Sequence, residues 1–252
     1  SGATPDQVIS LFPDMHVIPT GLKHGTVTVV SGGDPIEITT FRTDGEYKDS
    51  RRPESVTFSN NVEDDLSRRD FTVNAMAYNE RRGLVDLFGG KDDLERKIIR
   101  CVGDPEKRFS EDALRVLRAV RFASVLDFKV EKETKAAAES LCRNLSSVSA
   151  ERIFVEGKKL LGGKAAYRIL EESRDIISAF LPEIADAELP KSETFSSLSY
   201  EERQALIFAV TSGEVGFLAF SSALKFDNKT KSRGVDILRA LTLKDGMTDS
   251  EI

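Results

Sequence analysis

The spacing of apolar residues along the chain changes near residue 100. Before that point, apolar and polar residues alternate over 26–30 and again over 36–41, on either side of turn residues at 31–34. This pattern predicts a β-hairpin over 25–42. From Ser110 onward, apolar positions recur with the period of an α-helix. Mixed elements followed by helices alone predict an α+β head and an all-helical body.

The other elements follow from capping and turn residues. Thr4 before Pro5 predicts a helix over 5–12, because threonine caps helices and proline fits their first position. Residues 43–67 are polar and interrupted by Pro53, which predicts a long loop. We then expect a short helix at 71–78, a strand at 84–88 and a helix at 92–99. Later helices are expected at about 111–126, 131–142, 150–161, 164–179, 200–211, 214–225 and 229–241.

Composition restricts the class of protein. Of the 252 residues, 40% are hydrophobic and 31% are charged, which is ordinary for a globular protein with its own core. No apolar run reaches membrane-spanning length and no segment resembles a signal peptide, so no membrane partner is expected. Cys101 and Cys142 are isolated and form neither a disulfide framework nor a zinc site. A reducing cytoplasm is therefore the expected compartment.

The net charge of −6 by itself argues against a nucleic-acid-binding protein. Arginines are nevertheless crowded between Arg42 and Arg121, while acidic residues dominate around 171–202. A locally basic face on an acidic protein can still hold phosphate groups. The charge distribution therefore leaves a phosphate-binding role open.

The most informative segment carries Asp112, Arg115, Arg118 and Arg121, spaced three residues apart with apolar residues between them. On a helix this spacing forms one polar ridge, which we call the arginine ridge. A carboxylate only accepts hydrogen bonds and a guanidinium only donates them. Cytosine and adenine both present an amino donor beside a ring-nitrogen acceptor, whereas uracil and guanine place a carbonyl where that amino group would be. Asp112 and Arg115 could thus select C and A, and Arg118 and Arg121 could hold the triphosphate.

The same residues also admit a purely structural interpretation. Acidic residues at 111 and 112, directly after Ser110, fit the first turn of a capped helix. An Asp–Arg pair one helical turn apart is also a common surface salt bridge. Spacing alone favours this structural interpretation over base selection.

Two further signals are weaker. Arg68 and Arg69 precede a helix start that Asp70 can cap, and backbone amides with arginines make an anion site. A capped helix with two solvated arginines is equally compatible. Glu37 lies inside the hairpin, where an outward-pointing charge is the default interpretation. A two-metal site needs several carboxylates, and no DxD partner occurs in the chain. Neither histidine has metal-ligand spacing, so no metal role is assigned to them.

Taken together, these segments resemble the class II tRNA nucleotidyltransferases and their bacterial poly(A) polymerase relatives. The resemblance rests on RRDFTVNA at 68–75, DLFGG at 86–90 and EDALRVLRAVRF at 111–122. The segments 23–27, 37–42, 51–56 and 150–153, with Glu156 and Lys159, add to it in the same order. The match covers residues 1 to about 163 and is highly specific.

The resemblance implies an organisation and an activity. It implies a partial nucleotidyltransferase-type antiparallel sheet head over 1–100, a helical neck over 101–163 and a helical body over 164–252. The implied reaction is template-independent addition of CCA to tRNA 3′ ends from CTP and ATP with Mg²⁺. The DxD strand that binds the metal is expected upstream of Ser1 and a tail domain after Ile252, so residues 1–252 alone are not expected to transfer nucleotides.

The resemblance also implies roles for individual residues. Glu37 would be the accessory catalytic carboxylate of the metal site. Arg69 would contact the incoming nucleotide, supported by Asp70 and Asn74. Asp112 and Arg115 would be the protein template for the base, while Arg118 and Arg121 would hold ribose and phosphates.

Two alternatives remain open at this point. The first is a bacterial poly(A) polymerase or an A-adding enzyme of the same family. Poly(A) polymerases share these motifs but usually carry a basic-aromatic run before the first hairpin strand, and the segment TGLKHG at 20–25 lacks it. A full-length loop between Thr43 and Ser67, expected to switch the site from C to A addition, argues against a CC-only enzyme. A non-catalytic RNA-binding module is the alternative from another class.

Overall fold

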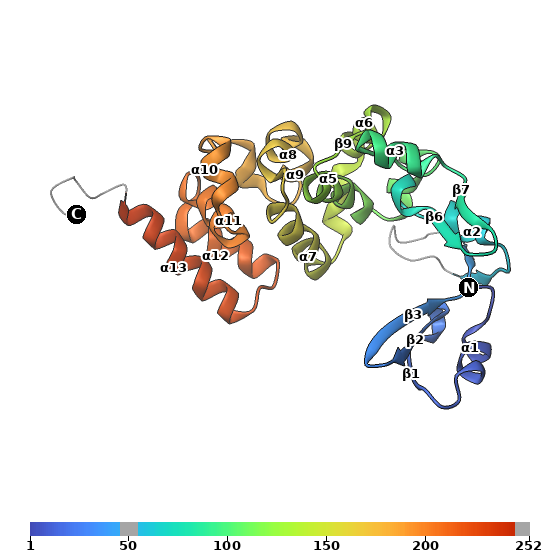
Figure 1. Cartoon of the computed structure of the whole chain (residues 1–252). Helices are drawn as coiled ribbons and strands as arrows, with labels where there is room; N and C mark the ends of the chain where they lie inside the picture. The colour runs from blue at the N-terminus through green and yellow to red at the C-terminus, as the bar shows by residue number, and fades with distance from the viewer. Residues whose placement is uncertain (46–54, 245–252) are drawn as a thin grey trace. The chain divides into compact units, whose positions relative to one another are not determined.

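The computed structural model describes residues 1–45 and 55–244 (Figure 1). The chain divides into two compact units, residues 1–94 with 100–104, and residues 95–99 with those from 105 onward. The first unit carries small antiparallel sheets and the second is mainly helical, which confirms the predicted α+β class. The finer division into head, neck and body stays a prediction. No helix within the described ranges has both the length and the apolar character needed to cross a membrane.

The first unit begins with helix α1 (Pro5–Leu11) and a three-stranded antiparallel sheet in the order β1-β2-β3. Thr4 Oγ1 accepts from the Gln7 amide, and the Gln7 side chain accepts from the Thr4 amide, which confirms the predicted cap. The core between helix and sheet contains Val8, Val27 and Val29. The helix and the sheet therefore share one small hydrophobic core.

The predicted hairpin is confirmed as β2 (Thr26–Ser31) and β3 (Asp34–Thr39). Gly32 and Gly33 form its two-residue turn with φ of +60° and +95°, a combination that glycine adopts without strain. Strand β1 (His16–Gly21) was not predicted. It occupies the sheet edge, where a proline such as Pro19 is tolerated. A short 3₁₀ helix, η1 (Leu22–His24), joins β1 to β2.

The predicted loop over 43–67 is wrong in part. Strands β4 (Arg42–Asp44) and β5 (Val56–Phe58) pair antiparallel, and helix α2 (Val62–Ser67) follows. Asn61 begins that helix by accepting from the Glu63 amide through its side chain. Residues 46–54, which belong to the loop expected to switch the site, lie outside the described residues.

The predicted helix over 71–78 is also wrong. The chain forms a single 3₁₀ turn, η2 (Thr72–Asn74), and then strand β6 (Met76–Asn79), paired with β7 (Gly83–Asp86). Phe71 is completely buried and bridges to Cys101, so a tertiary contact fixes extended backbone where a helix was expected. The predicted strand over 84–88 corresponds to β7.

Asp86 begins helix α3 (Gly90–Arg96) by accepting from the amides of Gly90 and Lys91, both at 2.8 Å. Burial raises the pKa of Asp86, but hydrogen bonds from backbone amides outweigh it and hold that pKa below its ordinary value. The helix predicted over 92–99 ends early, because Lys97 has a φ of +58° and β8 (Ile98–Ile99) follows.

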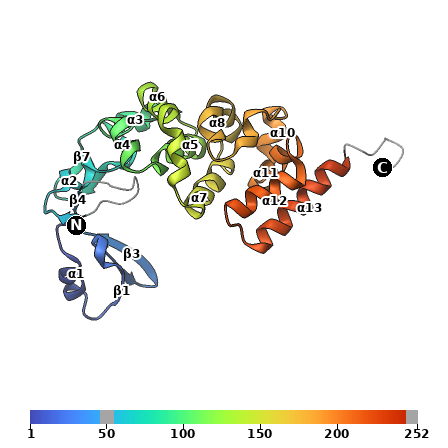
Figure 2. The ribbon, with the colours of Figure 1, turned by 180° about the vertical axis from the view of Figure 1, so that it is seen from behind.

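The second unit is built almost entirely from helices (Figure 2). One two-residue parallel pair, β8 with β9 (Lys129–Val130), departs from the all-helical prediction. The helices are α4 (Pro105–Glu111), α5 (Leu114–Leu126), α6 (Lys132–Leu141), α7 (Ala150–Leu161), α8 (Ala166–Glu172), α9 (Arg174–Ser178), α10 (Ser192–Ser197), α11 (Tyr200–Ala209), α12 (Gly213–Ala223) and α13 (Asn228–Lys244). Two 3₁₀ helices, η3 (Cys142–Ser147) and η4 (Pro182–Ala185), lie between them.

Most of the predicted helices in this unit are confirmed. The helix expected over 111–126 is α5, which begins later, at Leu114, and the preceding helix α4 was not predicted. The helix expected over 164–179 is instead two helices, α8 and α9. Helix α10 was not predicted. Helix α5 is surrounded by its neighbours, as its apolar sequence indicates: Val116, Leu117 and Val120 are fully buried.

Candidate functional site

The arginine ridge lies in the second unit, and its first member does not belong to the helix that carries the others. Helix α4 ends at Glu111 and α5 begins at Leu114, so Asp112 occupies the turn between them. The expected cap at Ser110 is wrong, because the Ser110 hydroxyl donates to the Glu106 carbonyl inside α4. Asp112 itself accepts from the Leu114 amide through Oδ1 at 3.1 Å. Asp112 therefore orients the start of α5.

The second oxygen of Asp112 is held from another helix. Arg152 on α7 donates from Nη2 to Asp112 Oδ2 at 2.8 Å. The side chains of Asp112 and Arg152 are 17% and 30% exposed, so this ion pair is largely shielded from water. A carboxylate oxygen has two acceptor positions, so each oxygen of Asp112 can take one more donor. The carboxylate is fixed in direction but retains capacity to bind a ligand.

Arg115 lies one turn after Asp112 and is held by the end of α4. Its Nη1 donates to Glu111 Oε2 at 2.6 Å and to the Arg108 carbonyl at 3.1 Å. Arg108 donates to the same carboxylate oxygen at 2.9 Å. The Arg115 side chain is only 10% exposed, so burial and these hydrogen bonds together hold its guanidinium in place. A fixed donor beside a fixed acceptor is what recognition of a base edge requires.

Arg118 and Arg121 share a single carboxylate, that of Glu156 on α7. Arg121 Nε donates to Glu156 Oε2 at 2.7 Å, while Arg118 Nη1 lies 3.7 Å from Oε1. The Arg121 guanidinium also lies 3.4 Å from the ring centre of Phe122. Arg121 is 9% exposed and Arg118 is 30% exposed. Of these two guanidinium groups, that of Arg118 is therefore the more accessible to a ligand.

The geometry combines features of both interpretations made from the sequence. All four ridge residues form ion pairs within the chain, as the structural interpretation expects. The pairs nevertheless fix a carboxylate and a guanidinium one turn apart, as base selection requires. The roles of these four residues in nucleotide binding stay predictions.

In the first unit, Arg69 follows helix α2 and donates from Nη2 to Asp65 Oδ2 at 2.7 Å. Arg68 binds the other oxygen of the same carboxylate at 2.6 Å. Burial raises the pKa of Asp65, but hydrogen bonds from Arg69 and Arg68 outweigh it and hold that pKa below its ordinary value. The Arg69 side chain is 43% exposed, so the guanidinium is anchored yet accessible to a ligand.

Asp70 and Asn74 support the turn that follows. Asp70 Oδ1 accepts from the Phe71 amide at 2.9 Å and from Asn74 Nδ2 at 3.2 Å. Since η2 is one short 3₁₀ turn, the expected anion site at an α-helix N-terminus is not formed here. The supporting role predicted for Asp70 and Asn74 thus rests on side-chain contacts.

Glu37 is exposed on β3, opposite Thr28 of β2. Within residues 1–45 and 55–244, no three His, Cys, Asp or Glu side chains gather in a way that could hold a metal ion. One exposed carboxylate does not make a site for a divalent ion. The catalytic and metal-binding role of Glu37 stays a prediction.

Several charged residues that hold the site were not assigned a role from the sequence, among them Glu111, which holds Arg115, and three others. These three are Asp65, Arg152 and Glu156, which hold Arg69, Asp112 and Arg121 respectively. Arg152 and Glu156 lie in the 150–156 segment on which the family resemblance drew. Both lie on one face of α7, and their role as partners of Asp112 and Arg121 can be recognised only when the packing of α7 on α5 is known.

Comparisons with known proteins agree with this description. The sequence matches the family described as "Poly A polymerase head domain" over residues 1–100. It also matches the family described as "Probable RNA and SrmB-binding site of polymerase A" over residues 127–188. The two matches fall largely in different structural units.

Among curated proteins, a CCA-adding enzyme of Geobacillus stearothermophilus is 42% identical over 246 residues, covering 96% of this chain and 60% of the relative. A CCA-adding enzyme of Pediococcus pentosaceus is 50% identical over 172 residues, covering 68% of this chain and 43% of the relative. The matched part of the chain thus spans 43–60% of the length of these relatives.

Among solved structures, the Bacillus stearothermophilus CCA-adding enzyme in complex with CTP matches with a TM-score of 0.78 at 38% identity. The match covers 95% of this chain and 59% of that one. The Thermotoga maritima CCA-adding enzyme complexed with tRNA matches with a TM-score of 0.64 at 21% identity, covering 93% and 58%. The second likeness concerns the fold alone.

Proposed function

The chain belongs to the family of the bacterial CCA-adding enzymes and poly A polymerase head-domain proteins, and we propose that its protein adds CCA to tRNA 3′ ends from CTP and ATP. The terminal ribose hydroxyl of the tRNA would attack the α-phosphate of the nucleotide. A new oxygen–phosphorus bond forms, the bond to the β-phosphate oxygen breaks, and pyrophosphate leaves. Because the chain spans about three fifths of its Geobacillus relative, the activity and both partners are proposals for the whole protein.

The observation that carries this proposal is the fixed pair of Asp112 and Arg115. Asp112 lies in the turn between α4 and α5, Arg115 lies in the first turn of α5, and the Arg115 amide donates to the Asp112 carbonyl at 2.9 Å. The carboxylate would accept from the amino group of cytosine or adenine, and the guanidinium would donate to the neighbouring ring nitrogen. With uracil or guanine, a carbonyl would face the carboxylate and leave buried polar groups unpaired, at roughly 1–3 kcal/mol each.

The other arginines would bind the parts of the nucleotide that all bases share. Arg118 would bind phosphate oxygens, since it is the more exposed of the two arginines on Glu156. Arg121 would support it, held against Phe122 and Glu156. Arg69, anchored by Asp65, is proposed as a further nucleotide contact, with Asp70 and Asn74 as support.

Nucleotidyl transfer in this family depends on a divalent metal ion, which we expect to be Mg²⁺. The described residues by themselves do not fit such an ion, because Glu37 is a single exposed carboxylate without metal-ligating neighbours among them. Glu37 is proposed as one accessory carboxylate.

The proposal is tested with the native protein that contains this sequence. It is incubated with a tRNA transcript lacking CCA, labelled CTP or ATP and Mg²⁺, and the products are sequenced. We expect two C residues followed by one A. Runs of A without C incorporation would identify a poly(A) polymerase instead, and tRNA binding without any incorporation would identify an RNA-binding module.

A further inference from the structure

A groove lies on the second unit where the end of α5, the last turns of α7 and the first turn of α11 meet, and none of its lining residues belongs to the arginine ridge. Its volume is about 470 Å³, and it is lined by Val125, Phe154, Val155, Lys158, Lys159, Gly162 and Tyr200. Val125, Phe154 and Val155 make part of its lining apolar, and we call these three residues its floor; Tyr200 adds an aromatic ring to the lining. We refer to these seven residues as the α7–α11 groove.

The rim of the α7–α11 groove is basic. Lys158 and Lys159 are both exposed in the last turn of α7. The Lys158 ammonium lies 4.6 Å from the centre of the Tyr200 ring, so positive charge and an aromatic face are already side by side. The groove thus joins a flat apolar surface to two cations.

The groove is a rigid feature. Arg203 on α11 donates to the carbonyls of Leu161 at 2.6 Å and Gly163 at 3.0 Å, which ties α11 to the end of α7. Ser199 and Glu202 form a reciprocal cap that fixes the start of α11 beside Tyr200. Phe154 packs on Phe226 with ring centres 4.2 Å apart. A ligand would therefore meet a surface that is already formed.

We propose that the α7–α11 groove binds RNA, taking one unstacked base on its apolar floor against Tyr200 and the adjoining phosphates on Lys158 and Lys159. Proteins bind single-stranded RNA by this combination of stacking surface and cationic rim. The inference rests on the proposed function, which makes RNA the substrate. The match to the RNA-binding family over 127–188 includes both lysines and leaves Tyr200 unassigned.

The size and charge of the groove favour RNA over a protein partner. A stable protein interface buries about 800 Å² on each side, which is far more than seven residues around a small groove supply. Phosphate groups, by contrast, complement two exposed ammonium groups directly. An apolar floor of this size accommodates a single base.

The test measures binding of the native protein to a tRNA transcript lacking CCA, as a function of salt. We expect Lys158→Ala and Lys159→Ala each to weaken binding and to reduce the slope of log K against log salt by about 0.7–0.9. Tyr200→Ala should weaken binding roughly 5- to 100-fold with the slope unchanged, because stacking releases no counterion. Tyr200→Phe keeps the ring and should bind like the wild type.

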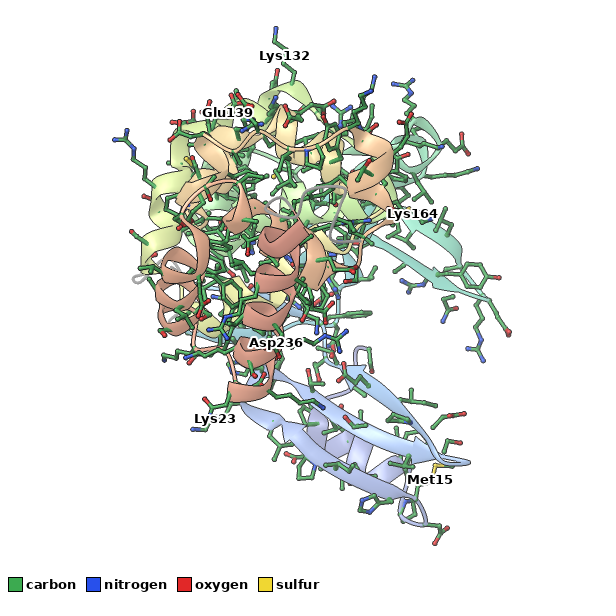
Figure 3. All side chains as sticks on the ribbon, turned by 90° about the vertical axis from the view of Figure 1, so that its left-hand side faces the viewer. Met15, Lys23, Lys132, Glu139, Lys164 and Asp236 are labelled. Atoms are coloured by element: carbon green, nitrogen blue, oxygen red, sulfur yellow. The ribbon has the colours of Figure 1, made fainter. Side chains whose placement is uncertain are left out.

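Lys132→Ala is the matched control. Lys132 is an exposed lysine at the start of α6, pointing away from the ribbon (Figure 3), and lies within the same RNA-binding match. A loss of slope with Lys132→Ala equal to that with Lys158→Ala would mean diffuse charge and would overturn the proposal. An unchanged affinity of Tyr200→Ala would overturn it as well.

Two measurements keep the result interpretable. Circular dichroism checks that each variant folds. Photo-crosslinking of the wild-type protein to RNA carrying 4-thiouridine should label peptides from α7 or α11, and labelling confined to other segments would overturn the proposal. If the wild type adds nucleotides while groove variants bind RNA normally, the groove inference fails and the proposed function stands. A wild type that binds no RNA refutes both.

Discussion

The carboxylate of Asp112 and the guanidinium of Arg152 form a 2.8 Å ion pair across 40 residues of sequence. One partner lies in the turn between α4 and α5, and the other lies on the first turns of α7. Because Asp112 is proposed to accept from the base, Arg152 acts as a positioning residue that fixes the direction of the acceptor.

We therefore predict that Arg152→Ala lowers kcat/KM for CTP and ATP about tenfold, the equivalent of one lost hydrogen bond of about 1.4 kcal/mol. Arg168→Ala is the control, since Arg168 is 31% exposed and forms a 2.9 Å pair with Asp127. Steady-state kinetics of both variants check the prediction. Equal losses with the two variants would contradict a specific role for Arg152.

The second prediction concerns how Asp65 contributes to stability at different pH values. The pKa of Asp65 lies below its ordinary value of 3.8, so its ion pairs stabilise the folded state fully above that pH. This contribution is lost as the pH falls through the lowered pKa. Asp65→Asn should reduce the free energy of unfolding at pH 7 by roughly 1–3 kcal/mol.

The measurement is denaturant unfolding of wild type and Asp65→Asn between pH 2 and pH 7. The difference between the two proteins should be constant above about pH 5 and shrink below the ordinary pKa of the carboxyl group. A difference that does not depend on pH would show that the Asp65 charge contributes nothing to stability.

The third prediction concerns the stability of a variant with a side chain at Gly90. A Cβ at this position would lie 2.2 Å from the Thr72 carbonyl oxygen, and backbone cannot move aside cheaply. Gly90→Ala should therefore destabilise the protein by about 1–3 kcal/mol. Gly157→Ala is the comparison, because its Cβ would meet only the Phe180 ring at 3.2 Å. Thermal unfolding of both variants measures the difference, and equal melting temperatures would refute the close approach at Gly90.

Strong local patterns made much of this fold predictable. The α7 helix was predicted within its bounds because its apolar period is sustained and Gly162 ends it. The β2–β3 hairpin was equally clear, because Gly32 and Gly33 stand between two alternating segments. In both cases the residues that form the element also mark its ends.

Elements fixed by distant contacts could not be predicted from their own residues. The break at Asp112 occurs among good helix formers, and Arg152, which holds the Asp112 side chain, lies 40 residues later on α7. The strand β6 forms because Phe71 is buried against a segment thirty residues later in the chain. Edge strand β1 contains Pro19, which weighs against a strand unless its edge position is known.

The candidate site likewise has features that the sequence could indicate and features that depend on distant parts of the fold. Residue types and spacing identified Asp112 and Arg115 as an acceptor–donor pair. The ion pairs that hold them, such as that of Glu111 with Arg115, depend on where α4 ends and could not be read from spacing. Likewise, nothing in the spacing distinguishes Arg118 from Arg121, although their burial differs.

The difference in burial between Arg118 and Arg121 leads to the fourth prediction. Arg118→Ala should weaken all nucleotides alike, because phosphate contacts carry no base information. Arg121→Ala should instead lower stability, because it leaves the buried Glu156 without its 2.7 Å partner. Nucleotide KM values and unfolding free energies are measured for both variants. Identical profiles would show that the two arginines share one role.

The fifth prediction concerns base selection itself. Asp112→Ala removes the acceptor that faces the amino group of cytosine or adenine, and with it the repulsion that excludes the uracil carbonyl. Discrimination against UTP should therefore collapse. Arg115→Ala should lower C and A incorporation together, because both bases present a ring-nitrogen acceptor at that edge.

Folding should survive Asp112→Ala, because the lost bond to the Leu114 amide is local and the turn is otherwise held by backbone bonds. Single-turnover incorporation of each of the four nucleotides is measured for each variant, with circular dichroism to check folding. Arg152→Ala serves as a second reference, because it should disturb the acceptor without removing it. If Asp112→Ala lowers activity but keeps the preference for C and A over U and G, Asp112 does not select the base. Its pairs with Arg152 and the Leu114 amide would then be its whole role, as the structural interpretation of the arginine ridge holds.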